Sequence, residues 1–222
     1  LRDGDEEGHI GAAELFAQQI ESHGWLKWTW EMWLGDYGQY PPFYAALLGG
    51  WWHLVGQDPE ALVLRLFPSL CHLITAVLML GIAARIGACR YTAYVLTLFL
   101  PLASGLSRHY MPETVMTLFS VAAIWAALRA QEQREWLIPT GLILGAGMMT
   151  KQSFAFIAIP TVFWILRPHW KQSWRIILGM ACVCGPWYSL HLSQQQEYAS
   201  STFAQDLGIG AQLSFYLHQI PL

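Results

Sequence analysis

An acidic run near the start of the chain contains the residues best suited to chemistry, in the order Asp3-Gly4-Asp5-Glu6-Glu7-Gly8-His9. Consecutive carboxylates repel one another unless a cation or hydrogen bonds compensate. This arrangement suits a general base or a metal ligand. Acids at the start of a helix are also favoured by the helix dipole, without any catalytic role. The local sequence supports both interpretations.

Two residues outside the acidic run are further candidates. Asp36 lies in a Gly- and Tyr-rich turn before Pro41-Pro42, where it either forms an Asx turn or is held against the acidic run. Lys151 interrupts an apolar run over residues 141–160. A lysine in or beside a membrane segment commonly pairs with an anion, although it can also snorkel from a helix end.

The composition indicates a membrane protein. Hydrophobic residues make up 55% and charged residues 12% of the 222 residues, whereas a soluble domain normally carries about 25% charged residues. Ten of the fifteen Asp and Glu residues lie in the first sixty positions. The net charge of −3 offers no basic surface, so we expect no nucleic acid as partner. The four cysteines lie in or beside apolar segments and are interpreted as packing residues.

Six stretches without Asp, Glu, Lys or Arg predict an all-α bundle of about six transmembrane helices over residues 61–222. Several are shorter than the roughly 20 residues that cross a bilayer, but flanking Arg, Lys, Trp and Tyr side chains can extend them into the interface. Six in succession favour a membrane bundle over a large soluble α-bundle. The stretches are 66–84, 91–107, 114–128, 136–150, 152–166 and 176–196.

Basic residues predict how this bundle lies in the membrane. Seven of the twelve Lys and Arg residues flank three alternate junctions, at residues 85–90, 129–134 and 167–175. The positive-inside rule makes these junctions cytoplasmic. The turns near residues 108–113 and 151, together with the acidic start, then lie on the extracytoplasmic side. A chain that starts outside lacks a first membrane-crossing helix, so we expect a fragment of a longer membrane protein.

Residues 1–60 are predicted to form an extracytoplasmic loop region with interfacial helices. Apolar residues recur at helical spacing within residues 7–23, and Gly24 is the expected stop. A Trp-rich stretch follows. Residues 43–56 form an aromatic segment of about fourteen residues, which is too short to span a bilayer and better suited to lie on the outer leaflet as a helix.

Several short strings of the sequence resemble one enzyme family. The Asp5-Glu6 pair resembles the acidic motif in the first outer loop of the GT-C-type membrane glycosyltransferases that use polyprenyl-phosphate sugars. This family includes the protein O-mannosyltransferases and the bacterial aminoarabinose transferase of lipid A. Further similar strings are Gln39–Tyr44 (a Pro-Pro-apolar-Tyr element), Leu64–Leu70 (an "RLPSAL" helix opening), Gly141–Gly145 with Thr150–Gln152 ("GLALG…LTK") and Pro186–Tyr188 ("PWY"). Their order and spacing cover nearly the whole chain.

The resemblance implies a GT-C-like fold and a catalytic acid in the first outer loop. Matching the motif places this acid at Asp5-Glu6, and a register shifted by one residue would place it at Glu6-Glu7. The family's second outer acid, a metal ligand in some members, has no match at Gln39. Asp36 is the substitute, so a divalent metal ion held by Asp5 and Asp36 is the one cofactor considered.

The resemblance also implies a site for the phosphate of the donor. The lysine that often stands immediately before Pro-Pro in the family is replaced here by Tyr40. This departure leaves Lys151 and Arg108 to hold the donor phosphate.

Together these features predict a membrane glycosyltransferase. It would move a sugar from a polyprenyl-phosphate donor to a lipid, glycan or protein acceptor at the extracytoplasmic face of a bacterial plasma membrane. A flippase for a lipid-linked sugar and an inactive scaffold member of the same family are the alternatives. Besides the catalytic Asp5 and Glu6, the residues expected to bind substrate are Glu7, His9, Asp36, Tyr40, Arg65, Arg108, His109 and Lys151.

Replacing Asp5 with Asn or Glu6 with Gln in the full-length protein should abolish sugar transfer and leave the fold intact, because each change removes a base without altering side-chain size. Transfer of labelled sugar to the acceptor measures the loss, and circular dichroism checks the fold. Full activity in both single variants and in the double variant would exclude this pair as the base.

Overall fold

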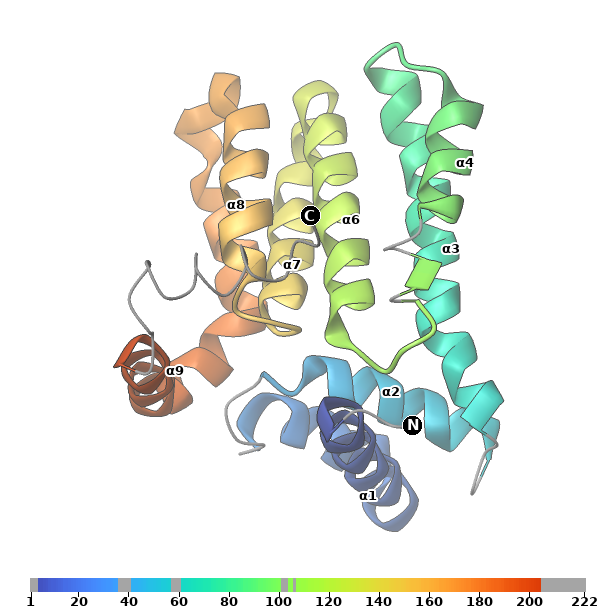
Figure 1. Cartoon of the computed structure of the whole chain (residues 1–222). Coiled ribbons are helices and arrows are strands. Elements are labelled where there is room, and N and C mark those ends of the chain that lie inside the picture. The colour runs from blue at the N-terminus through green and yellow to red at the C-terminus, as the bar shows by residue number, and fades with distance from the viewer. Residues whose placement is uncertain (1–3, 36–40, 57–60, 101–103, 106, 205–222) are drawn as a thin grey trace.

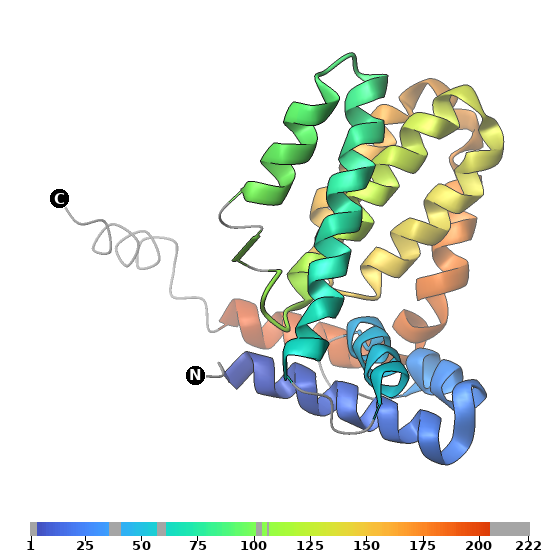
Figure 2. The same cartoon turned by 90° about the vertical axis from the view of Figure 1, so that its right-hand side faces the viewer.

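The computed structural model describes residues 4–35, 41–56, 61–100, 104–105 and 107–204, which form two layers of helices (Figure 1). The first layer is a bundle of α3 (Ala61–Arg85), α4 (Arg90–Phe99), α6 (Pro112–Glu132), α7 (Leu137–Met148), α8 (Phe154–Ile165) and the first part of α9 (Trp174–Ala204). The second layer lies across one end of the bundle and consists of α1 (Gly4–Leu34), α2 (Phe43–Val55) and the last part of α9 (Figure 2). No strand occurs in the described ranges.

The connections of the bundle alternate between its two ends. The α3–α4 turn, the 3₁₀ helix Arg134–Trp136 before α7 and the 3₁₀ helix Arg167–Gln172 before α9 lie together at the end away from α1 and α2 (Figure 1). The connections into α6 and from α7 to α8 lie at the opposite end, beside the second layer. The three basic junctions thus share one end, as their alternation predicts, and their cytoplasmic location stays a prediction.

Three of the described helices are long and apolar enough, by length and composition, to cross a membrane: Leu62–Arg85, Pro112–Glu132 and Trp174–Gln194. Their neighbours α4, α7 and α8 have 10, 12 and 12 residues. Large apolar side chains face outward from the bundle, and Phe156 of α8 is 84% exposed. Such a surface is costly in water and suits hydrocarbon. The predicted all-α membrane fold is confirmed, whereas complete crossings by α4, α7 and α8 stay predictions.

Gly24 breaks α1 into two segments. Its φ of 78° and ψ of 174° are non-helical, and only glycine adopts such angles readily. The first segment includes the predicted helix 7–23 and buries Phe16 and Ile20. The Trp-rich stretch after Gly24 is helical as well, to Leu34. Gly24 is therefore a bend between two helical segments rather than the end of helical structure.

Helix α2 matches the aromatic segment expected at residues 43–56 and packs against α1. A Cβ on Gly49 would lie 2.5 Å from the carbonyl oxygen of Ala13, so only a glycine allows the two backbones to approach this closely. Trp28 of α1 adds a hydrogen bond from its Nε1 to the carbonyl oxygen of Ala46, at 3.1 Å. These contacts join α1 and α2 in one layer.

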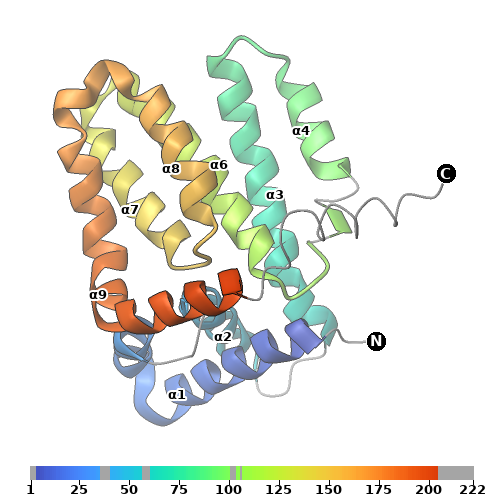
Figure 3. The same ribbon diagram turned by 60° about the vertical axis from the view of Figure 1, so that its left-hand side comes forward.

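Helix α9 links the two layers through a bend at His191, where φ is −109° and ψ is 16°. The His191 ring stacks on Trp187 with 4.7 Å between ring centroids, and Nδ1 lies 2.9 Å from the Trp187 carbonyl oxygen. Beyond the bend, α9 runs across the end of the bundle, alongside α1 (Figure 3). The first and the last helices thus meet in the second layer.

The expectation for the cysteines holds for two of the four. Cys71 and Cys184 are buried, as packing residues should be. Cys89 and Cys182 are exposed, and all four are free thiols. The exposed pair corrects the interpretation of every cysteine as a packing residue, because Cys89 precedes α4 and Cys182 lies on an outward face of α9.

Glycines bring α7 and α9 into backbone contact. A Cβ on Gly141 would meet the carbonyl oxygen of Ile176, and one on Gly145 would lie 2.8 Å from the carbonyl oxygen of Met180. On α9, a Cβ on Gly179 would lie 2.6 Å from the carbonyl oxygen of Ile138 of α7. Small residues on both helices permit this close approach, which is typical of helix pairs in membranes.

Replacing Gly141 with Ala should destabilise the protein by about 1–3 kcal/mol, because the added methyl group overlaps the backbone of α9. Gly11, exposed on α1, has no atom within 4 Å of an added Cβ, so Gly11→Ala is the matched control and should not destabilise. Melting of the detergent-solubilised variants measures both effects. Equal melting temperatures for the two would contradict the backbone contact.

Candidate functional site

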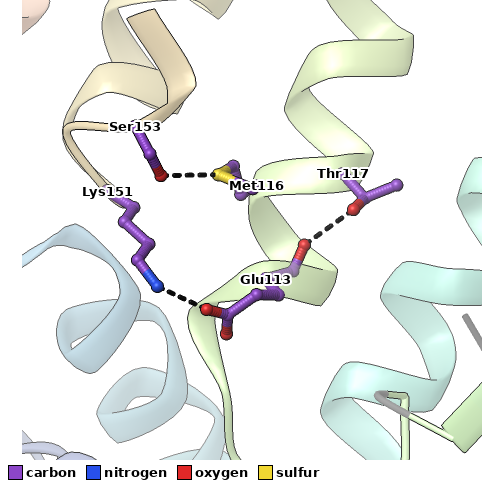
Figure 4. Close-up of polar contacts among 5 residues, drawn as sticks. All are labelled: Glu113, Met116, Thr117, Lys151 and Ser153. Carbon is purple, nitrogen blue, oxygen red and sulfur yellow. Dashed lines mark hydrogen bonds and ion pairs between the residues drawn. The ribbon is translucent and has the colours of Figure 1, made fainter. Parts of the chain in front are cut away.

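An ion pair between Glu113 and Lys151 is the charged centre at the end of the bundle that meets the second layer (Figure 4). Lys151 Nζ donates a hydrogen bond to Glu113 Oε1. Each side chain is 29% exposed, so the pair is partly withdrawn from water but still accessible. The second carboxylate oxygen of Glu113, Oε2, is buried and has no hydrogen-bond partner among the described residues. Glu113 Oε2 is therefore an acceptor without a donor among the described residues.

The start of α6 positions Glu113. Pro112 is the first residue of the helix, and Glu113 follows in its first turn. Proline is favoured there because its missing N–H needs no acceptor, and a carboxylate is favoured by the helix dipole. Thr117, one turn later, donates to the Glu113 carbonyl oxygen at 2.8 Å. The backbone under the carboxylate is thus regular helix.

The end of α7 positions Lys151. Thr150 donates from Oγ1 to the Gly147 carbonyl oxygen at 2.6 Å, which closes the last turn. Tyr188 of α9 donates from its hydroxyl to the Met148 carbonyl oxygen at 3.0 Å. Two residues after the lysine, Ser153 Oγ lies 3.6 Å from Met116 Sδ of α6 (Figure 4). The loop that carries Lys151 is therefore tied to both α9 and α6.

A backbone hydrogen bond joins this loop to the second layer. The Phe43 N–H at the start of α2 donates to the Met149 carbonyl oxygen at 3.2 Å. The next residue, Tyr44, is 2% exposed and meets the His9 ring of α1 edge to face, with 5.4 Å between centroids. The His9–Tyr44 contact and the Phe43–Met149 hydrogen bond thus link α1, through α2, to the loop that carries Lys151.

The acidic run lies in the same layer. Asp5 and Glu6 are in the first turn of α1, one turn before His9, and their side chains lie outside the described part of the structure. Glu7 is exposed on the same helix. The roles expected for these three acids stay predictions.

Three other expected residues lie at this end of the bundle on α3 and on the loop before α6. Arg65 lies over the Tyr110 ring, with its guanidinium carbon 5.5 Å from the ring centroid. Arg108 and His109 are exposed. A hydrogen bond from Ser69 Oγ to the Ser107 carbonyl oxygen, at 3.2 Å, joins α3 to this loop. Lys151, on the loop after α7, contacts Glu113 of α6.

Asp36 and Tyr40 lie outside the described residues, so their expected contacts are untested. In the ranges that are described, no group of three or more His, Cys, Asp or Glu residues could hold a metal ion. The side chains of Asp5 and Asp36 lie outside the described part of the structure, so a divalent metal ion held by them stays a prediction.

Glu113 was predicted to lie with the extracytoplasmic turns but was given no role. Its pairing with Lys151 joins residues 38 positions apart, which spacing alone does not reveal. The available signal was that Pro112-Glu113 is typical of a helix start. This start was expected at the same end of the bundle as Lys151, which follows the end of another helix. Tyr188 was known only as part of a motif, and the structure shows that its hydroxyl holds the end of α7.

The fold and this site define an integral membrane protein with an all-α bundle and a charged centre at one end. A family model described as dolichyl-phosphate-mannose-protein mannosyltransferase matches residues 39–186. The chain belongs to this family, and is a membrane glycosyltransferase of the GT-C type. Searches with the chain matched no curated protein and no solved structure. The matched residues include Glu113 and Lys151, whereas the acidic run precedes them.

Replacing Lys151 with Met should lower the stability of the fold by about 1–2 kcal/mol, because Glu113 would keep its charge in a partly buried position without its partner. Lys171→Met removes an exposed lysine at the other end and is the matched control. Melting curves of detergent-solubilised protein compare the two. Adding Glu113→Gln to Lys151→Met should restore part of the loss, and a purely additive further loss would show that the pair contributes no coupling energy.

Proposed function

We propose that the protein transfers a sugar from a polyprenyl-phosphate carrier to an acceptor at the extracytoplasmic face of a bacterial plasma membrane. The observation that carries this proposal is the partly exposed Lys151 at the end of an apolar bundle, in a chain of the mannosyltransferase family. A lipid-linked donor must keep its hydrocarbon in the bilayer and its phosphate at the surface. Lys151 is at the position where such a phosphate would arrive.

Lys151 would act on the leaving group. When the bond between the sugar carbon and the phosphate oxygen breaks, the bonding electrons stay on the polyprenyl phosphate. A fixed cation beside that oxygen stabilises the developing charge. Glu113 holds the ammonium group in place before the donor binds. The donor phosphate would then replace or share Glu113 as the partner of Lys151.

Asp5 or Glu6 would act on the acceptor. The acceptor hydroxyl or amine attacks the sugar carbon and must lose a proton, which a nearby carboxylate can take. Support for this role comes from His9 of α1, which contacts Tyr44 of α2, next to Phe43, whose N–H donates to the Met149 carbonyl oxygen in the loop before Lys151. The acid would thus face the acceptor while the lysine faces the leaving phosphate.

The location of the charges favours an enzyme over a flippase. Transporters for charged substrates carry charged or broken helices near the middle of the membrane. Glu113 is in the first turn of α6, and Lys151 follows the end of α7. A charged centre at the bundle end suits chemistry at the membrane surface. The acceptor can be a lipid, a glycan or a protein.

The proposal is tested by incubating the full-length protein with radiolabelled polyprenyl-phosphate sugars and following the release of the lipid phosphate. Lys151→Met should lower the rate of release by about a hundredfold, because one preorganised contact to a developing oxyanion contributes about that much. Lys171→Met should leave the rate unchanged. Movement of the intact donor across the bilayer without release would instead identify a flippase, and binding without either would identify an inactive scaffold.

A further inference from the structure

A cluster of arginine and tryptophan lies at the end of the bundle opposite to Glu113 and Lys151. Arg129 is in the last turn of α6 and its guanidinium carbon lies 5.3 Å from the ring centroid of Trp125 and 5.7 Å from that of Trp136. The two indole rings meet edge to face, with 5.1 Å between centroids. The guanidinium is thus held against two aromatic rings, which attract a cation through their quadrupoles.

Trp125 is fixed from the α3 side. A Cβ on Gly81 would lie 2.7 Å from Trp125 Nε1, so this glycine leaves the space that the indole fills. Arg85 follows Gly81 by one turn on α3, and residues four apart share a helix face. The cluster therefore takes residues from α3, from α6 and from the 3₁₀ helix that follows α6.

The Nε atoms of both arginines in this cluster are buried without a hydrogen-bond partner among the described residues. Nε of Arg129 is buried and has no hydrogen-bond partner, and no carboxylate pairs with this arginine within the part of the chain that the structure describes. Nε of Arg85 is also buried without a hydrogen bond, and its nearest carboxylate oxygen is Glu132 Oε1, at 3.8 Å. The Glu132 side chain is 60% exposed, so this contact is weak. Unsatisfied buried donors call for an acceptor from outside the chain.

The acceptor available at this level is the headgroup of a lipid. The segments of α3 and α6 that are long and apolar enough to cross a membrane end at Arg85 and Glu132, which is where hydrocarbon would give way to headgroups. Tryptophan is enriched at that depth. A guanidinium presents paired donors that match the oxygens of a phosphate.

Other arginines at this end also lie over tryptophan rings but form no enclosed site. Arg167 lies 4.6 Å from the centroid of Trp164, and Arg175 lies 5.6 Å from that of Trp174. These two tryptophans are 69% and 57% exposed. They add positive charge to the surface, whereas the Arg129 guanidinium lies against two rings and Arg129 is half-buried.

We propose that Arg129 and Arg85 bind the phosphate of an anionic phospholipid in the leaflet at this end of the bundle. Trp125 and Trp136 hold the Arg129 guanidinium toward the headgroup. The surrounding arginines favour a headgroup of net negative charge over a zwitterionic one, whose ammonium group they would repel. This site is separate from the proposed sugar transfer, because Arg129 and Glu113 are sixteen residues apart on α6, or roughly 24 Å along the helix axis.

The test uses the full-length protein in a neutral detergent, titrated with phosphatidylglycerol or with phosphatidylcholine while thermal melting is followed. Phosphatidylglycerol should raise the melting temperature more than phosphatidylcholine does. Arg129→Gln should weaken the apparent affinity for phosphatidylglycerol about tenfold, through the loss of hydrogen bonds to a charged group. Arg134→Gln removes the same charge from an exposed position in the same junction and should change the affinity less than about twofold.

Each of the following results would overturn the proposal. Equal stabilisation by both lipids would show that the headgroup charge is not recognised, and equal losses in Arg129→Gln and Arg134→Gln would show only diffuse attraction. Competition by millimolar inorganic phosphate as strong as that by the lipid would identify a free-phosphate site. If Arg129→Gln does not fold, Arg129→Lys keeps the charge without the paired donors. An unchanged affinity in that variant would contradict the role of the guanidinium.

Discussion

In the part of the chain that the structure describes, the charged side chains of the apolar bundle lie at its two ends, and the arrangement of the proposed sites follows from that. An ionised group in the middle of a bilayer is costly, and the six bundle helices place theirs at or near their termini. Glu113 and Lys151 meet at one end, and Arg85 and Arg129 lie at the other. The chemistry proposed for the protein therefore belongs to a surface, where water, headgroups and a lipid-linked phosphate come together.

The end that carries Glu113 and Lys151 is also the end that the second layer covers. The hydrogen bond between Phe43 and Met149 fixes the start of α2 beside the loop of Lys151, and the contact between His9 and Tyr44 brings α1 to the same place. A loop after a membrane helix is usually mobile, but this one is held by α2, by α6 and by Tyr188 of α9. Such a support would preorganise Lys151 for the phosphate of the proposed donor.

The fold class and the grouping of the three basic junctions at one end of the bundle were predictable from the sequence, because apolar runs and the alternation of arginines are local signals. The bend at Gly24 was predictable as an interruption, but the helix after it was not, since the tryptophans there lack a clear apolar period. The pairing of Glu113 with Lys151 depends on how α6 and α7 pack. That packing is set by side-chain shape, through contacts such as Gly141 against Ile176, and no spacing rule reveals it. The acidic run was found from its charge alone. Its expected role rests on a resemblance to a family motif, and the family match over residues 39–186 does not include the run.

The bend of α9 at His191 has a consequence for the order in which the protein assembles. The layer across the end of the bundle contains α1, which precedes the bundle helices in the chain, and the last part of α9, which follows them. Helices α1 and α2 can pack together early, but their neighbour in the layer is added only after the whole bundle has been synthesised. This layer thus gains its third helix only after the bundle helices, so a chain interrupted before His191 would carry Glu113 and Lys151 beneath an unfinished cover.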